Sequence, residues 1–148
     1  MKTDNLDLDI LNVLLNNSRL SYRQIAKKAK VSAATVMHRI NAMEKEGIIK
    51  KYSVYLDFEK LGYDFMVVVS LKISKGKLFE VEKKIAQEPN VTSVYDVLGD
   101  SDAVLFGKFK TKKSMDQFIK RIQTYDFVEW TKSFFVMNVI KKDRIYLT

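Results

Sequence analysis

The sequence predicts an α+β protein in two parts: an N-terminal winged helix-turn-helix and a C-terminal ferredoxin-like βαββαβ domain. Three observations predict this fold. Apolar residues recur at helical spacing up to residue 46, they alternate at strand spacing from residue 65 onward, and two helical stretches interrupt that second part. We expect a helix-turn-helix domain at residues 1–50, a connecting strand or linker at 51–62, and the ferredoxin-like domain at 63–148.

The N-terminal part contains three helical patterns in close succession. Residues 4–17 carry an apolar stripe behind an acidic first turn, which predicts the first helix. Ser21 and Gln24 have capping-box spacing and begin a second, short helix. Ser32 can cap a third helix from Ala33 to about Glu46, and Gly47 is placed to end it. The buried stripe of this third helix is expected to be Val36, Ile40 and Met43.

The residues after the third helix predict β structure. Residues 48–58 are β-branched and aromatic, which favours a strand pair or one extended strand. We then expect strands at 65–73, 91–98, 103–109 and 128–140, a helix at 77–87, and a second helix that opens with a capping box at Ser114–Gln117.

The last predicted strand is apolar on both faces. Trp130 and Phe134 alternate with Phe135 and Met137, although the two helices of a ferredoxin-like sheet cover only one of its faces. A second subunit is the simplest cover for the other face, so we expect a homodimer.

Composition limits the class of protein. The chain has 148 residues, 47% of them apolar, and no cysteine, which excludes disulfides, cysteine-ligated zinc and thiol catalysis. The N-terminus is charged where a signal peptide is apolar, and no apolar run is long enough to span a bilayer. We expect a cytoplasmic, prokaryotic protein associated with the nucleoid and not with a membrane.

Positive charge is concentrated near the predicted second and third helices. The formal net charge is +8, and residues 19–51 hold nine basic side chains against two acidic ones. Such a patch attracts phosphate through counterion release, which indicates a nucleic-acid partner. A solvated lysine-rich surface gives the same pattern, so charge alone leaves both interpretations open.

Four segments along the chain form a recognisable pattern: Leu6–Leu11, Arg19-Leu20-Ser21, the stretch from Ile25 to Ile49, and Gly99-Asp100-Ser101-Asp102. In these segments the sequence resembles the Lrp/AsnC family of leucine-responsive, or feast/famine, regulators, whose acidic loop has the form Gly-Asp-x-Asp. The resemblance covers almost the whole chain. It implies a transcriptional regulator that binds double-stranded DNA as a homodimer, tetramer or octamer and responds to a small effector such as an amino acid.

The third helix of a helix-turn-helix lies in the major groove, and its outward residues face the bases. Arg39 has two interpretations, a DNA contact or a tether to its own domain, and Ser32 is either a cap or a phosphate ligand. Residues at the start of the second helix and after Gly47 are candidates for contacts with the DNA backbone. The candidate DNA-binding residues are Ser21, Tyr22, Arg23, Ser32, Ala34, Thr35, His38, Arg39, Asn41, Lys50 and Lys51.

The acidic loop offers a second candidate site. Asp100 and Asp102 lie two residues apart, a pattern that fits acid–base chemistry, a cation site or an ordinary polar turn. The resemblance implies instead that Gly99, Asp100, Ser101 and Asp102 hold the amino group of the effector between subunits. Ser101 and Ala103 stand where aromatic residues are common in the family, so the effector pocket is expected to differ in shape.

Nothing in the sequence indicates an enzyme. The single histidine, His38, lies on the predicted DNA-binding helix, and no phosphate-binding or dinucleotide-binding motif is present. We therefore expect no catalytic residues, no metal and no cofactor. The alternatives are a small-molecule binding or interaction module in which the helical part is only a tether, and RNA binding by the exposed sheet.

Overall fold

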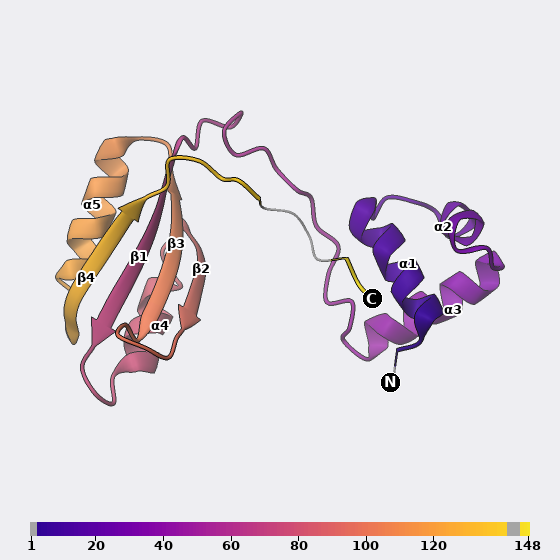
Figure 1. The fold of residues 1–148 in the computed structure, drawn as a ribbon, viewed down its shortest axis with the longest axis horizontal. Coiled ribbons are helices and arrows are strands. Elements are labelled where there is room, and N and C mark those ends of the chain that lie inside the picture. The colour runs from indigo at the N-terminus through magenta and orange to yellow at the C-terminus, as the bar shows by residue number, and fades with distance from the viewer. Residues whose placement is uncertain (1–2, 142–145) are drawn as a thin grey trace. The chain divides into compact units, whose positions relative to one another are not determined.

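The computed structural model describes residues 3–141 and 146–148 and divides the chain into two compact units (Figure 1). The N-terminal unit is Met1–Tyr55 together with Lys141–Thr148, and the C-terminal unit is Leu56–Ile140. Each unit has a hydrophobic core of its own and is described by itself. Within the described residues, no helix has both the length and the apolar character needed to cross a bilayer.

The N-terminal unit is built on the helices α1 (Asn5–Asn16), α2 (Tyr22–Ala29) and α3 (Ala33–Lys45). Each begins at a side chain that accepts a backbone hydrogen bond from the first turn, and α1 and α2 have complete capping boxes. Lys30 ends α2 in the left-handed conformation, with φ of 56°, which forms the tight turn into α3. The core of the unit is Ile10, Leu14, Ile25, Ala26, Val36, Ile40 and Met43.

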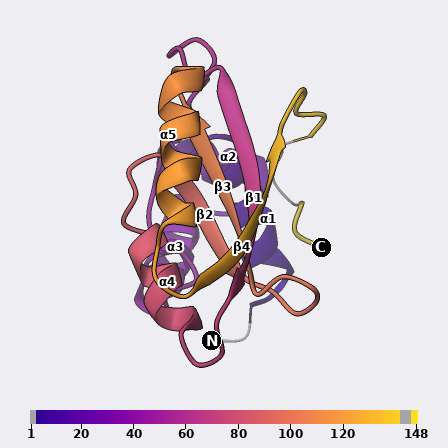
Figure 2. The same cartoon turned by 90° about the vertical axis from the view of Figure 1, so that its left-hand side faces the viewer.

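The C-terminal unit is a four-stranded antiparallel sheet with α4 (Leu78–Ile85) and α5 (Lys112–Gln123) on one face (Figure 2). Its strands lie in the order β2-β3-β1-β4, where β1 is Phe65–Ile73, β2 Val91–Asp96, β3 Ala103–Phe109 and β4 Val128–Phe135. Alternate residues of β1 and β3 are buried against the two helices, as strand periodicity requires. The predicted βαββαβ fold is confirmed.

Three predicted elements differ from the structure. Residues 50–57 form no strand within the described chain, since the sheet consists of β2, β3, β1 and β4 and includes no part of this segment. Helix α5 begins at Lys112, since the hydroxyl of Thr111, and not that of Ser114, accepts the capping hydrogen bond, at 3.1 Å. The last strand ends at Phe135 instead of residue 140, because its pairing with β1 ends there, opposite Val67.

The C-terminal residues lie beyond the sheet, and the expected domain at 63–148 stays a prediction. By their contacts, Lys141–Thr148 group with the N-terminal unit. The reason is a pair of hydrogen bonds between Asn12 of α1 and the backbone of Leu147.

Candidate nucleic-acid interface and effector loop

Helix α3 buries one side and exposes the other within its unit. Val36, Ile40 and Met43 are fully buried against α1 and α2, and the opposite side is open to solvent. The predicted contact residues Ala34, His38 and Asn41 are exposed there, and Thr35 is half-buried at the edge.

Two further residues of α3 share this outward side and were not predicted. Met37 is 45% exposed, and Lys45 is exposed one helical turn beyond Asn41. Each lies four residues from Asn41, the spacing that places side chains on one face of a helix, and this is the signal that could have found them. The outward side is therefore Ala34, Met37, His38, Asn41 and Lys45, a mixture of apolar, amide, imidazole and cationic groups that suits base edges and phosphate.

The start of α3 is an intact cap. The hydroxyl of Ser32 accepts a hydrogen bond from the backbone N–H of Thr35 at 3.0 Å, and the two hydroxyl oxygens lie 2.8 Å apart. The remaining N–H groups of the first turn have no acceptor within the helix itself and carry the positive end of its dipole. This end of α3 can thus accept a phosphate while Ser32 keeps its capping role.

Arg39 connects α3 to α1. Its Nη1 lies 2.8 Å from Oδ2 of Asp4 and 3.3 Å from Oδ2 of Asp7, whose side chain is fully buried. The hydrogen bond that Asp4 accepts from the Asp7 backbone lowers the pKa of Asp4, with a smaller effect from Arg39. The hydrogen bond that Arg39 donates to Asp4 likewise raises the pKa of Arg39. Of the two interpretations of Arg39, this geometry favours the tether.

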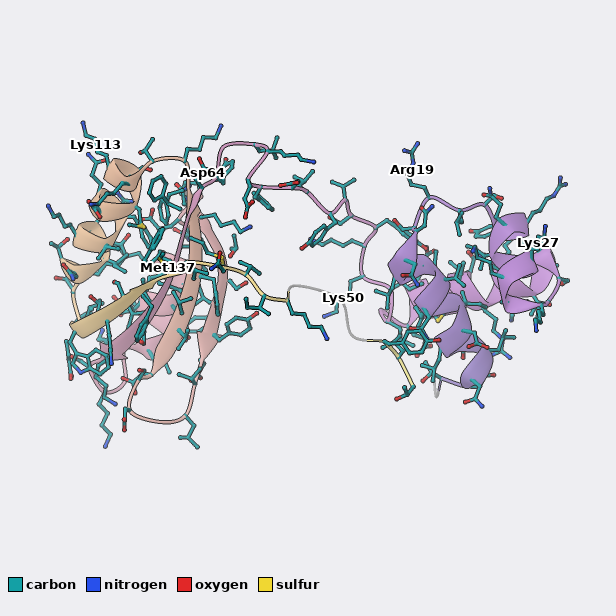
Figure 3. The ribbon with its side chains drawn as sticks, turned by 45° about the horizontal axis from the view of Figure 1, so that its top comes forward. Arg19, Lys27, Lys50, Asp64, Lys113 and Met137 are labelled. Atoms are coloured by element: carbon teal, nitrogen blue, oxygen red, sulfur yellow. The ribbon has the colours of Figure 1, made fainter. Side chains whose placement is uncertain are left out.

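The other basic candidates lie at the edges of the helical unit. Ser21 caps α2 through Gln24, and Tyr22 and Arg23 are exposed in its first turn. Figure 3 shows the side chains of Arg19 and Lys27 projecting away from the helices.

Lys50 and Lys51 lie in the exposed segment that follows α3. They line an open hollow of about 400 Å³ whose apolar wall comes from leucines of α1. Beside them, the hydroxyl of Tyr52 donates to Glu44 at 2.7 Å, which fixes the segment against α3. Burial, assisted by this carboxylate, raises the pKa of Tyr52 to about 12.

The acidic loop lies between β2 and β3, and its two carboxylates have different surroundings. Asp102 accepts a hydrogen bond from the backbone N–H of Ile73 at 2.8 Å and contacts the ammonium of Lys72 at 2.9 Å. The first of these bonds, followed by Lys72, lowers the pKa of Asp102. Asp100 is exposed at the tip of the loop. Asp102 therefore holds the loop against β1, and Asp100 faces solvent.

The sheet face opposite the helices is exposed and carries a cluster of aromatic and aliphatic side chains, with Lys72, Lys108 and Lys132 on the same face. The register places Phe134 beside Val68 and Val68 beside Phe106, and Trp130 lies farther along the same face of β4. Trp130 and Phe134 remain 41% and 47% exposed, and Tyr95 packs edge-on against Phe106. Across the described residues there is no group of three His, Cys, Asp or Glu side chains arranged to hold a metal ion.

Comparisons with known proteins match both units. Residues 3–50 match the family model of a winged helix-turn-helix DNA-binding domain, and residues 66–146 match the Lrp/AsnC ligand-binding domain. An uncharacterized HTH-type transcriptional regulator of Pyrococcus furiosus is 39% identical over 97% of both chains. Among solved structures, AsnC of E. coli has a TM-score of 0.92 at 25% identity, covering 99% of this chain and 100% of that one. A transcriptional regulator of Neisseria meningitidis in complex with L-Met has a TM-score of 0.90 at 23% identity, covering 99% and 97% of the two chains.

An exposed recognition helix on one unit and a ligand-binding domain as the other define a DNA-binding transcriptional regulator with a sensory domain. The chain belongs to the Lrp/AsnC family.

Proposed function

We propose that this regulator binds duplex DNA as a homodimer through the outward side of α3 and responds to an amino acid bound at the acidic loop. The observation that carries the DNA part is the separation of the two sides of α3, with its apolar residues buried and its polar residues exposed. In this proposal the protein catalyses no reaction and acts in the cytoplasm, where prokaryotic DNA lies.

The proposed DNA contacts fall into two groups, contacts with base edges and contacts with phosphates. Ala34, Thr35, His38 and Asn41 are proposed to face base edges, where an amide or imidazole pairs with donors and acceptors and an alanine meets a thymine methyl. Ser21, Tyr22, Arg23, Ser32, Lys50 and Lys51 are proposed to contact phosphates, which position the protein without selecting sequence. Arg39 is assigned to the tether with Asp4 and Asp7 and acts on DNA only by holding α3 in place.

A second copy of the chain is proposed to cover the exposed sheet face. The support is its apolar character, since a monomer that leaves Trp130, Phe134 and Phe106 together on an open face exposes a patch typical of an interface. Two copies related by a twofold axis present two α3 helices to one duplex. Tetramers or octamers of such dimers follow from the family resemblance.

The effector is proposed to bind at Gly99, Asp100, Ser101 and Asp102. The exposed carboxylate of Asp100 suits an ammonium group, and Asp102 keeps the loop in shape through Ile73 and Lys72. The Neisseria neighbour in complex with L-Met makes an amino acid the class to test first. Calorimetry with each common amino acid tests this part, with Asp100→Asn expected to abolish the binding heat of the amino acid that binds.

The test of DNA binding is selection of bound sites from random duplex DNA, followed by fluorescence anisotropy on the selected operator. Asn41→Ala is expected to lower affinity by about tenfold, the value of one base contact. Asn17→Ala, on the far end of α1, is the matched control and should leave affinity unchanged. Lys50→Gln should weaken binding to all sequences alike and reduce the salt slope by about one. If the chain selects no sequence and its affinity is insensitive to salt, the proposal is wrong.

Dimerisation is tested by light scattering. Wild type is expected to be a dimer or a larger assembly at micromolar concentration, and Trp130→Lys to dissociate because it places a charge on the apolar face. Lys113→Glu, an exposed position on α5 and therefore on the helix side of the sheet, alters charge away from this face and serves as a comparison.

A further inference from the structure

Asn12 is a buried polar residue on α1, and its side chain hydrogen-bonds to the backbone of Leu147, 135 positions later in the chain. It is 7% exposed and lies between the fully buried Ile10 and the core residue Leu14. Its Nδ2 donates to the carbonyl of Leu147 at 2.9 Å, and its Oδ1 accepts from the backbone N–H of Leu147 at 2.9 Å. With the tail in place, both polar atoms of this buried amide are paired with the backbone of Leu147, as buried polar groups in proteins usually are.

The two hydrogen bonds have a definite form. A single residue of an extended chain donates its N–H and offers its C=O to the same partner, as one residue does in an antiparallel ladder. Recognition therefore depends on the backbone of the tail. The side chain of Leu147 is half-buried, whereas Tyr146 and Thr148 are exposed.

A shallow hollow of about 350 Å³ lies beside this contact. Its walls are α1 residues, including Asp9, Val13 and Asn16, the end of α2 at Ala29 and Lys30, and Tyr146 of the tail itself. The helices thus form one side of a groove, and the tail lies along it.

We propose that this groove on the DNA-binding unit is a binding site for an extended peptide, and that its ligand is the C-terminal tail of the same chain, residues 146–148. The tail then acts as a second tether. The chain leaves the N-terminal unit after Tyr55 and returns to it at Lys141, so the docked tail joins the ferredoxin-like unit to the helical unit at both of its ends.

The length of the chain limits the reach of this tether. Between the end of β4 at Phe135 and Tyr146, the chain can span about 40 Å at most when fully extended. Two short connections restrict the motion of one unit relative to the other more than a single connection does. A restricted unit meets a second DNA half-site at a higher effective concentration, a consequence that depends on the proposed function.

The docking is tested by carboxypeptidase trimming of the full chain, with the released residues followed by mass spectrometry. Asn12→Leu removes both hydrogen bonds, and we expect it to lose Thr148 and Leu147 at least tenfold faster than wild type, as loss of two hydrogen bonds implies. Asn5→Leu, an exposed position in the first turn of α1 that does not line the groove, is the matched control and should be trimmed at the wild-type rate. Equal trimming of wild type and Asn12→Leu would overturn the proposal.

Hydrogen exchange of the Leu147 amide tests the docking in wild type, without any substitution. We expect exchange at least tenfold slower than in a synthetic peptide of residues 141–148, because the N–H is bonded to Asn12. Exchange at the rate of the free peptide overturns the proposal even if Asn12→Leu fails to fold.

The tethering is tested on DNA with a chain that lacks residues 146–148. It should bind a duplex with two half-sites several-fold more weakly than wild type and bind a single half-site equally well. Equal binding of the two-site duplex by both chains overturns the tethering. If wild type itself binds no DNA, the proposed function fails, and the trimming and exchange results still decide the docking.

Discussion

A pair of substitutions three residues apart can distinguish the buried side of α3 from its outward side. Ile40 is 1% exposed and packs among the core residues of the N-terminal unit, while Met37 is 45% exposed on the outward side. Ile40→Val removes one buried methylene and should lower the free energy of unfolding by about 0.5 to 1.5 kcal/mol. Met37→Ala removes side-chain atoms that are largely in water and should change it by less than about 0.5 kcal/mol.

The choice of valine at residue 40 follows from the size of the unit. A unit of this length has a total stability of about 3 to 9 kcal/mol, and Ile40→Ala would cost about 2 to 5 kcal/mol, enough to unfold much of it. The milder change keeps the unit folded, so stability and DNA affinity can be measured on the same sample.

Only one of the two substitutions should affect DNA binding. Ile40→Val should leave the affinity for the operator unchanged, whereas Met37→Ala should lower it by about fivefold, the equivalent of about 1 kcal/mol of apolar contact. Urea unfolding followed by circular dichroism and fluorescence anisotropy on the operator measure the two quantities. If Met37→Ala destabilises the unit as much as Ile40→Val does and leaves DNA binding intact, the assignment of the outward side is refuted.

Three further outcomes follow from individual contacts. If Arg39 is a tether, Arg39→Gln should destabilise the unit because it leaves the buried Asp7 carboxylate without a cation. Adding Asp7→Asn should then restore both the urea midpoint and the DNA affinity. A DNA affinity that stays low in the double variant would instead assign Arg39 to DNA. The Arg121 guanidinium lowers the pKa of Glu88. The stability that this pair contributes is therefore present above the unfolded pKa of about 4.3 and is lost as pH falls through the lower folded pKa. Glu88→Gln should make the urea midpoint fall less between neutral and acidic pH than it does in wild type. Thr111→Ala removes the N-cap of α5 and should cost about 1 kcal/mol in thermal unfolding, and no change would contradict the cap.

Local patterns in the sequence predicted the elements and the inward side of each. The strand periodicity at residues 65–73 and the apolar spacing of α3 match the observed strand and buried stripe, because burial on one face imposes its period on the sequence. The cap of α5 was misplaced because Thr111 and Ser114 both have a hydroxyl at a plausible position, and only the backbone geometry selects between them.

Contacts between distant residues could not be predicted. Leu147 and Asn12 are 135 positions apart, and neither residue type indicates the other. The same holds for Arg39, whose partners Asp4 and Asp7 lie on another helix, so the sequence left its role open. The segment 50–57 has the composition of a strand, but a strand forms only where a neighbour supplies hydrogen bonds, and composition does not identify that neighbour.

In the proposed function, the two exposed surfaces of this chain depend on each other. One α3 helix is proposed to offer about four side chains to bases, at about 1 to 3 kcal/mol each, and part of that energy is offset by ordering the side chains. A regulator needs about 4 to 10 kcal/mol of preference for its operator over other DNA, which one helix reaches only with every contact intact. A second α3 on the same duplex doubles the contacts, whereas the entropy cost of bringing protein and DNA together is incurred only once. The apolar face around Trp130 and Phe134 would therefore support sequence preference although it lies in the unit without α3, so a chain made monomeric by Trp130→Lys should keep its weak, salt-sensitive DNA binding and lose its preference for the operator.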